Sequence, residues 1–270
     1  MAIILSGERK AKRILRDLSK QAKGKRLKLV VVQVGSNMVS ASYIGEKQKA
    51  AEIAGIKFEL VQLPVSISQK KIEDTITKLG KDSRNTGIIV QLPLPKELKT
   101  QDVLNRIIPE KDVDLLSSAA FGMFTLGHSK ILPPTVAAIA TLLKGQSLKE
   151  KKVVVVGAGR LVGIPASIWL LQEQAQVSII DKKTKDKAML FKQADIIISG
   201  VGKKDLIKGS MIKRGAVVID AGTSVENGTA SGDVDFTSVV AKAKAVTPVP
   251  GGVGPLTVSH LLRNLVILSS

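Results

Sequence analysis

Glycines at a spacing typical of phosphate binding follow one of the apolar runs of this chain. Residues 153–156 are four consecutive valines, and Gly157, Gly159 and Gly163 come directly after them. Glycines at such positions let the backbone turn tightly and approach a pyrophosphate, and the next helix points its N–H groups and positive dipole end at the ligand. The pattern therefore predicts a dinucleotide site. A tight strand-to-helix turn that holds no ligand is the alternative.

An acidic residue stands where the ribose of such a dinucleotide would lie. Asp181 ends the next apolar run, about 20 residues beyond the glycines. A carboxylate there accepts hydrogen bonds from free ribose hydroxyls and repels a 2′-phosphate. Lys182 and Lys183 partly offset that repulsion. The sequence thus favours NAD as the cofactor and leaves NADP open.

A tyrosine, a lysine and a glutamine in the first half of the chain form a second candidate site. Tyr43 and Lys47 are spaced so that they share one face of a predicted helix. An aromatic ring one turn from an amine can line a pocket for a flat heterocycle, but a half-buried core tyrosine beside an exposed lysine fits the pair too. Gln91 is more telling, because it ends an apolar strand, where α/β sheets place their ligands.

The elements that must position these residues alternate between strands and helices. The first half of the chain predicts helices over 5–23, 40–54 and 68–79 and strands over 27–34, 57–63 and 87–92. The second half predicts helices over 134–145, 161–172 and 256–268, strands over 153–156, 177–180, 194–198 and 216–219, and a rigid loop over 248–255. This rhythm is typical of parallel α/β sheets.

The composition excludes several classes of site. Apolar residues make up 44% of the chain and charged residues 24%, as in a soluble globular protein. With no cysteine and two histidines, the chain lacks the material for disulfides, zinc–thiolate sites or thiol nucleophiles, and we expect no metal site. No apolar run approaches the roughly 18 residues of a membrane span, and no signal peptide precedes the basic residues near the N-terminus, so we expect a cytoplasmic protein.

The strong positive charge leaves two interpretations. A formal net charge of +18 suits either a nucleic-acid-binding protein or an enzyme with an anionic small substrate. Aromatic residues are only 3%, and the lysines are scattered instead of concentrated on one helix. Because single-strand binding depends on aromatic stacking platforms, we expect no specific nucleic-acid partner.

Five segments form a collinear series over nearly the whole chain. They are Ser40 with Tyr43 and Lys47 in an SxxYxxxK pattern, GIIVQLPLP at 87–95, KDVD at 111–114, GDVDF at 232–236 and TPVPGGVGPLT at 247–257. This series resembles the bacterial methylenetetrahydrofolate dehydrogenase/cyclohydrolase family. The segments at 87–95 and 247–257 are too long and too specific for a chance agreement.

The resemblance implies a bifunctional enzyme of one-carbon folate metabolism. Such an enzyme oxidises 5,10-methylenetetrahydrofolate with NAD or NADP and hydrolyses the methenyl product to 10-formyltetrahydrofolate. Lys47 would be the catalytic lysine of the hydrolysis, Gln91 would hold its amine, and Asp114 would bind the pterin. The substrate would also contact Ser40, Tyr43, Leu92, Pro93, Gly254 and Pro255. The cofactor would contact Gly157, Ala158, Gly159, Arg160, Val162, Gly163, Asp181, Lys182, Thr223 and Thr257.

The implied fold is an α/β fold with two domains. Residues 1–133 would form a parallel α/β folate domain, with 256–270 packing back on it, and residues 134–255 a Rossmann-like domain. The active site would lie in the cleft between them. The resemblance also implies a homodimer, and the positive charge favours a polyglutamylated folate.

Several positions depart from the family pattern. The family usually has glycine after KDVD, where this chain has Leu115. Its Arg-Ser pair, which recognises the 2′-phosphate of NADP, is Ala158-Gly159 here, and Asp181-Lys182 replaces a His-Ser pair. These departures leave the cofactor choice open. A dehydrogenase without cyclohydrolase activity, or a basic nucleic-acid-binding protein that kept the fold, are the alternatives.

Overall fold

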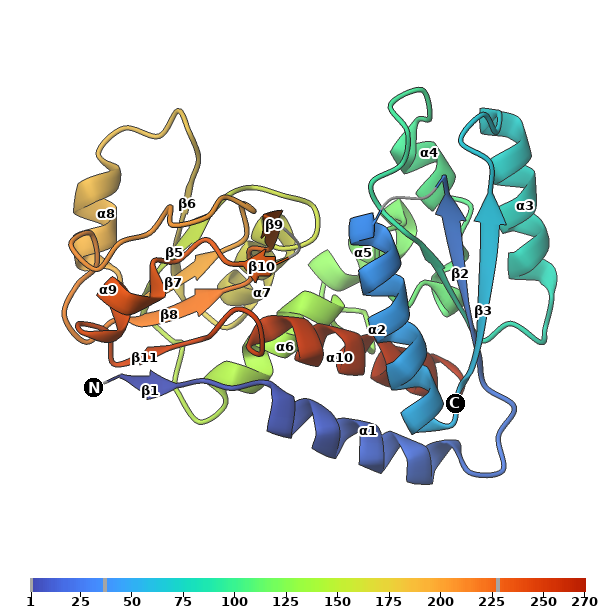
Figure 1. The fold of residues 1–270 in the computed structure, drawn as a ribbon, viewed down its shortest axis with the longest axis horizontal. Coiled ribbons are helices and arrows are strands. Elements are labelled where there is room, and N and C mark those ends of the chain that lie inside the picture. The colour runs from blue at the N-terminus through green and yellow to red at the C-terminus, as the bar shows by residue number, and fades with distance from the viewer. Residues whose placement is uncertain (1, 36–37, 227–228) are drawn as a thin grey trace. The chain divides into compact units, whose positions relative to one another are not determined.

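The computed structural model describes residues 2–35, 38–226 and 229–270, without the side chains of 38–40, 225, 226 and 229 (Figure 1). The chain forms two compact units. The Lys47 unit comprises Lys12–Pro134 and Val258–Ser270, and the glycine-turn unit comprises Met1–Ala11 and Thr135–Thr257. Neither unit is a single stretch of sequence.

A three-stranded parallel sheet forms the centre of the Lys47 unit. Its order is β3 (Lys57–Leu63), β2 (Lys28–Val34) and β4 (Gly87–Val90). The helices of this part of the chain are α1 (Glu8–Ala22), α2 (Met38–Ala54), α3 (Gln69–Lys81), α4 (Thr100–Leu104), the 3₁₀ turn η1 (Pro109–Lys111), α5 (Ser118–Thr125) and α10 (Val253–Leu268).

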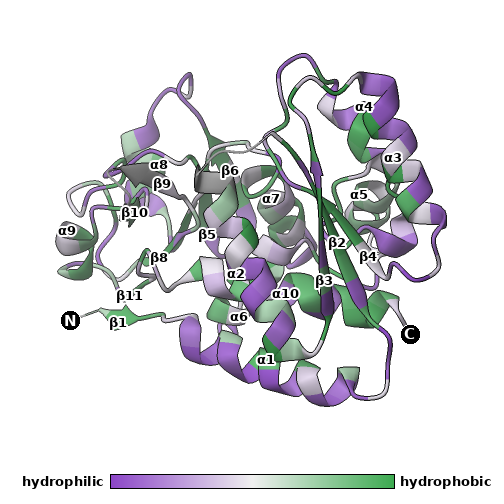
Figure 2. Ribbon diagram, turned by 45° about the vertical axis from the view of Figure 1, so that its right-hand side comes forward, coloured by the Kyte–Doolittle hydropathy of each residue, from purple (hydrophilic) through white to green (hydrophobic). Residues whose placement is uncertain are grey.

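Alternate residues of these strands face two different cores. Leu29 and Val31 of β2 pack in a cluster with residues of α1, α2 and α10, whereas Val32 packs with residues of α3 and α4. The sheet is therefore covered on both faces, and β2 and β4 read as largely apolar runs, whereas the edge strand β3 also carries polar residues. Figure 1 shows α2 and α3 on either side of the sheet, and Figure 2 shows that α1 carries mostly hydrophilic residues.

The glycine-turn unit is built on a six-stranded parallel sheet. Its order is β1 (Ile3–Ile4), β11 (Ala245–Val246), β8 (Val217–Asp220), β7 (Ile196–Ser199), β5 (Lys152–Val156) and β6 (Gln176–Ile180). The unit also contains α6 (Pro134–Leu143), α7 (Gly163–Gln172), α8 (Lys187–Gln193), α9 (Phe236–Val240) and the antiparallel pair β9 (Ser224–Glu226) and β10 (Thr229–Ser231). Because β5 pairs with β6 on one side and β7 on the other, the strand order reverses at β5, where such sheets bind ligands.

The structure confirms the predicted two-domain α/β fold with parallel sheets and corrects three details. The first residues do not belong with the Lys47 unit, because β1 pairs with β11 at the edge of the larger sheet. The predicted loop over 248–255 is too long, since α10 begins at Val253 and its first turn includes Pro255. Short elements such as α4, α5, α8 and α9 were not predicted. Among the described residues, no helix combines the length and apolar character needed to cross a membrane.

Candidate active site

Lys47 and Gln91 meet in the Lys47 unit. The Lys47 Nζ atom of α2 donates a hydrogen bond to Gln91 Oε1 at 2.7 Å, and both residues are half-buried. Gln91 follows β4, where its backbone N–H donates to the carbonyl of Val32. Its side-chain amide donates to the carbonyl of Leu92 at 2.9 Å, which leaves Oε1 facing the lysine. The end of the apolar strand thus fixes the acceptor for the amine.

Burial controls the charges of Lys47 and Asp114. Desolvation lowers the pKa of Lys47 from its ordinary value, while the negative charge of Asp114 acts in the opposite direction. Burial raises the pKa of Asp114 to about 6; Lys47 lowers it, and the nearby charge of Asp112 raises it further. Both groups are therefore shifted toward neutral pH, where groups that transfer protons work best.

The segment that carries Asp114 is fixed by hydrogen bonds to its backbone. Asp112 is fully buried and accepts from the backbone N–H groups of Leu116 at 3.2 Å and Ser117 at 2.7 Å. The side-chain amide of Asn264 in α10 donates to the carbonyl of Val113 at 2.9 Å. Asp112 therefore has a structural role, and sequence reasoning missed Asn264 because an asparagine in a helix carries no signal of its distant partners.

The segment that departs from the family pattern has an unusual backbone. Leu115 has a φ of 55°, in the left-handed region that favours glycine, and its side chain is buried. A glycine at this position, as in the family pattern, would adopt this backbone conformation without steric cost. This chain keeps the geometry with a leucine, whose buried side chain offsets a conformational cost of about 1–2 kcal/mol.

The remaining residues expected to contact the substrate vary in exposure. The Tyr43 side chain is 37% exposed. Leu92 is half-buried and Pro93 is exposed. Gly254 and Pro255 lie in the first turn of α10, in the glycine-turn unit. The side chain of Ser40 lies outside the part of the chain that the structure describes.

The glycines after β5 form a tight turn that leaves no room for a side chain at Gly163. Gly157 has a φ of 93°, and a Cβ on Gly163 would overlap the carbonyl oxygen of Gly157. Helix α7 begins at Gly163, so its positive dipole end lies at this turn; the Ile164 N–H donates to the carbonyl of Gly159, and Pro165 has no N–H. Ala158, Gly159 and Arg160 are exposed along it. The glycines, the exposed residues of the turn and the N-terminus of α7 together fit a pyrophosphate.

Asp181 follows β6 and organises the turn after that strand. Its Oδ1 atom accepts hydrogen bonds from the backbone N–H of Lys183 at 2.8 Å and from the backbone N–H and hydroxyl of Thr184, each at 3.0 Å. These bonds lower the pKa of Asp181, so the exposed side chain carries a full negative charge at neutral pH. The turn uses one carboxylate oxygen. The aspartate therefore has a local structural role, and its charge faces solvent beside the exposed Lys182.

The three remaining residues expected to contact the cofactor belong to the same unit. Thr223 is exposed after β8. The Thr257 hydroxyl donates to the carbonyl of Val253 at 3.2 Å, one turn earlier in α10. Val162 is half-buried and directly precedes α7.

Two domains of one protein family match different parts of this chain. The catalytic domain of tetrahydrofolate dehydrogenase/cyclohydrolase matches residues 5–114, and the NAD(P)-binding domain of the same enzymes matches residues 133–270. The chain belongs to the tetrahydrofolate dehydrogenase/cyclohydrolase family. The resemblance seen in the sequence is thereby confirmed.

Known members of the family match nearly the full length of the chain. The "Bifunctional protein FolD 2" of Lactobacillus johnsonii is 40% identical over 100% of this chain and 98% of its own. The solved structure of the bifunctional enzyme from Campylobacter jejuni is 37% identical, with a TM-score of 0.95 over 100% of this chain and 99% of that one. The Trypanosoma brucei enzyme, solved with NADP and an inhibitor, is 34% identical, with a TM-score of 0.94 over 99% and 97%.

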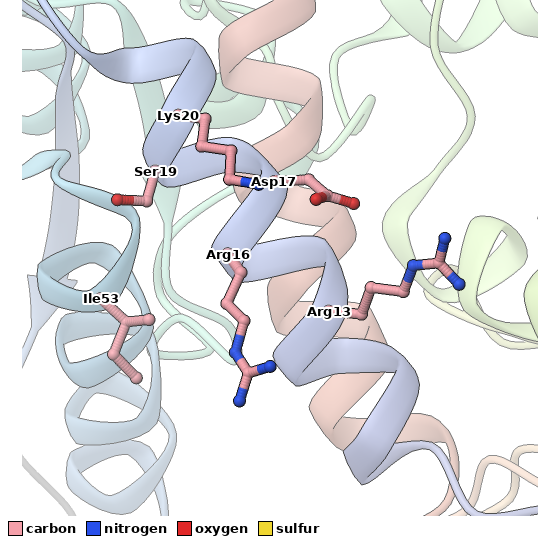
Figure 3. A pocket seen from close by; sticks show the side chains of 6 residues that line it. All are labelled: Arg13, Arg16, Asp17, Ser19, Lys20 and Ile53. Carbon is pink, nitrogen blue, oxygen red and sulfur yellow. The ribbon is translucent and has the colours of Figure 1, made fainter.

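A basic hollow on the Lys47 unit is lined by α1 and α2. It is lined by Arg13, Arg16, Asp17, Ser19 and Lys20 of α1 and Ile53 of α2 (Figure 3). In Figure 3 the side chains of Arg13 and Arg16 extend to different sides of α1. The hollow contains none of the expected catalytic residues, and three of its six side chains are cationic.

Proposed function

We propose that this chain catalyses both reactions of its family. It oxidises 5,10-methylenetetrahydrofolate to the methenyl compound with a nicotinamide dinucleotide, and it hydrolyses that compound to 10-formyltetrahydrofolate. The family assignment supports both activities. The observation that carries the second one is the 2.7 Å hydrogen bond between Lys47 and Gln91.

The folate-side groups supply proton transfer and orientation. As water attacks the methenyl carbon, neutral Lys47 accepts a proton from it. The lysine then returns a proton to N5 as the bond between that carbon and N5 breaks, and the second proton of the water leaves when the formyl group forms. The lowered pKa of Lys47 keeps enough of the amine neutral for this role. Asp114 accepts hydrogen bonds from the pterin, and the ring of Tyr43 packs on it.

The oxidation needs orientation more than acid–base chemistry. When bound, the dinucleotide accepts the hydride, and the folate nitrogens stabilise the cation that remains. The backbone of the Gly157–Gly163 turn holds the pyrophosphate, and Arg160, Thr223 and Thr257 contact the rest of the molecule. Accurate orientation of the two reactants lowers the barrier by several kcal/mol.

NAD is the preferred dinucleotide in this proposal. Asp181 keeps a full negative charge beside the expected ribose position, and its free oxygen accepts from the ribose hydroxyls. The chain also has Ala158-Gly159 in place of the Arg-Ser pair. Lys182 and Arg160 are exposed cations near the turn and support some use of NADP, the dinucleotide bound by the Trypanosoma brucei relative.

The substrate is best bound with a polyglutamate tail, and the enzyme is a homodimer. The net charge of +18 attracts extra carboxylates, and the basic hollow offers cations for them. The double variant Arg13→Ala/Arg16→Ala should raise the KM for a polyglutamylated folate more than that for the monoglutamate. Lys71→Ala/Lys78→Ala, exposed cations on α3, removes the same charge as a control. Equal changes in both KM values would contradict a polyglutamate site in the basic hollow. The dimer is a separate expectation, and a monomer measured by light scattering would contradict it.

Two absorbance assays test the proposal. The first follows methenyl formation from methylenetetrahydrofolate with NAD or NADP, and the second follows hydrolysis of isolated methenyltetrahydrofolate without a dinucleotide. We expect activity in both and a higher kcat/KM with NAD. Oxidation without hydrolysis would identify a dehydrogenase alone, and a preference for NADP would overturn the cofactor assignment.

A further inference from the structure

Two aspartates of the glycine-turn unit are buried without being part of the expected site. Asp220 ends β8 and is 2% exposed, and Asp233, in the segment before α9, is fully buried. A buried carboxylate is costly unless hydrogen bonds replace its lost water. The partners of the two side chains therefore show what these residues do.

Asp233 holds the loop that follows β7. Its Oδ2 atom accepts from the hydroxyl of Ser199 at 2.6 Å and from the backbone N–H of Val201 at 2.7 Å. Its Oδ1 atom accepts from the backbone N–H of Lys203, also at 2.7 Å. One carboxylate thus binds every second residue from Ser199 to Lys203, at the carboxyl end of a central strand.

Asp220 holds the loop that follows β8 and also holds the segment of Asp233. Its Oδ1 atom accepts from the backbone N–H groups of Gly222 at 3.0 Å and Asp233 at 3.1 Å, and its Oδ2 atom accepts from that of Val234 at 2.9 Å. The backbone N–H of Asp220 donates to the Thr247 hydroxyl at 2.7 Å. The two carboxylates therefore form one connected network.

Glycines allow the backbone to approach both carboxylates. A Cβ on Gly222 would overlap the carboxyl group of Asp233, and one on Gly232 would overlap that of Asp220. Burial raises the pKa of Asp220 to about 6, and the neighbouring charge of Asp233 contributes to the rise. The network keeps two acidic groups close together at a cost that its backbone hydrogen bonds must offset.

The loop held by Asp233 packs against the glycine turn. A Cβ on Gly157 would lie 3.1 Å from Cγ2 of Val201, and a Cβ on Gly200 would overlap the side chain of Val162. The loop after β7 therefore touches both the beginning and the end of the turn. A shift of this loop would change the space available at the turn.

We infer that Asp220 and Asp233 are positioning residues for the dinucleotide, acting through the loops after β7 and β8 and through the glycine turn. Both loops leave the carboxyl ends of parallel strands, at the edge where open α/β sheets bind ligands. The two aspartates themselves are buried and take no part in hydride transfer. The inference rests on the proposed function, since it assumes a dinucleotide at this turn.

The variant Asp233→Asn tests this role with the full-length enzyme. An asparagine keeps the shape but replaces one acceptor oxygen with a donor, which opposes an N–H group of the loop. We expect the Kd for NADH, measured by its fluorescence, to rise about tenfold or more. Hydrolysis of methenyltetrahydrofolate, which needs no dinucleotide and transfers protons through Lys47 of the other unit, should keep its kcat/KM within about twofold.

A neighbouring aspartate provides the matched control. Asp235 caps α9 by accepting from the backbone N–H of Ser238 at 3.2 Å, a contact within the first turn of its own helix. Because asparagine is an equally good helix cap, Asp235→Asn should leave both the Kd and the hydrolysis unchanged. An unchanged Kd in folded Asp233→Asn, or an equal loss of hydrolysis, would overturn the positioning role.

A milder variant keeps the test decisive if Asp233→Asn does not fold. Ser199→Ala removes one of the bonds to Asp233 and leaves its two backbone partners. A rise in Kd of about two- to fivefold would support the inference, and an unchanged Kd would overturn it. A wild-type enzyme that hydrolyses the folate but binds no dinucleotide would instead contradict the dehydrogenase half of the proposed function.

Discussion

Asp114 and Asp181 show how the two units adapt the same side chain to different tasks. Asp114 is half-buried next to Lys47, and its pKa rises to about 6. Asp181 is exposed, and hydrogen bonds from Lys183 and Thr184 lower its pKa. Burial thus prepares one carboxylate for a site where protons move, while the other keeps a fixed charge suited to recognition.

The two sites also differ in what the chain has kept of the family pattern. The Lys47 unit keeps its lysine, glutamine and aspartate, which depend on each other through burial and a hydrogen bond. The glycine-turn unit keeps the glycines of its turn but differs from the pattern at three exposed positions, Ala158, Gly159 and Asp181. An exposed side chain can change without disturbing a core, so cofactor choice is easier to alter than the hydrolytic chemistry.

The largest effect should come from Lys47→Met. Loss of the amine removes the group that transfers protons, so hydrolysis of methenyltetrahydrofolate should fall by at least about 100-fold. Dinucleotide binding, measured by NADH fluorescence, should remain, since it depends on the other unit. Lys49→Met, an exposed lysine on the same helix, is the control. Hydrolysis at the wild-type rate in the Lys47 variant would show that Lys47 does not transfer protons in this reaction, and the contrast between the two units would fail.

The glycine turn should tolerate no side chain at its end. Gly163→Ala places a Cβ against the carbonyl oxygen of Gly157, so we expect a loss of about 2–3 kcal/mol in the free energy of unfolding and weaker NADH binding. Gly80→Ala, a helical glycine of α3 with open space around it, should instead gain up to about 1 kcal/mol. Urea denaturation checks both, and equal stabilities would show that the turn is not tightly packed.

The raised pKa of Asp114 should appear in the pH dependence of stability. In the unfolded chain this carboxyl has its ordinary pKa of 3.8, and in the folded chain burial raises the pKa to about 6. Its favourable contribution is therefore present below pH 4 and is lost as the pH rises to about 6. Asp114→Asn removes that loss and should gain about 2 kcal/mol relative to wild type at pH 7, but little at pH 4. A gain of the same size at both pH values would contradict the burial argument.

The smallest of these effects concerns the cofactor ratio. Asp181→Ser removes the charge that repels a 2′-phosphate, so the ratio of kcat/KM for NADP to that for NAD should rise by about tenfold. Asp186→Asn removes a nearby exposed charge and should change the ratio little. If wild type already prefers NADP and Asp181→Ser leaves the ratio unchanged, Asp181 does not contact the ribose.

Local patterns predicted the parts of this structure that depend on neighbouring residues. The strand at β2 and the turn from Gly157 to Gly163 could be read from sequence, because each is a continuous run with its own geometric signature. The two-residue strand β1 could not, since it exists only by pairing with Ala245 and Val246. The bond from the backbone N–H of Lys183 to Asp181 had a usable signal, because aspartate side chains in turns commonly accept from the backbone two residues on.

Contacts across long distances in sequence account for what was missed at the site. Asn264 supports the segment of Asp114 from 151 positions away in the chain. Asp233 was noticed only as part of a family motif, and nothing nearby in sequence indicates that it holds Val201. The sequence showed Leu115 as a departure from the family pattern but not its left-handed backbone, which the structure shows.

The path of the chain through the two units has a consequence for the synthesis of the protein. The core of the Lys47 unit includes Leu261, Leu262 and Leu265 of α10, although the rest of that unit ends at Pro134. The intervening residues build the glycine-turn unit, which is complete in sequence at Thr257. On the ribosome, where domains usually fold in order from the N-terminus, the half of the protein that is made first must therefore wait for the final helix to fill its core.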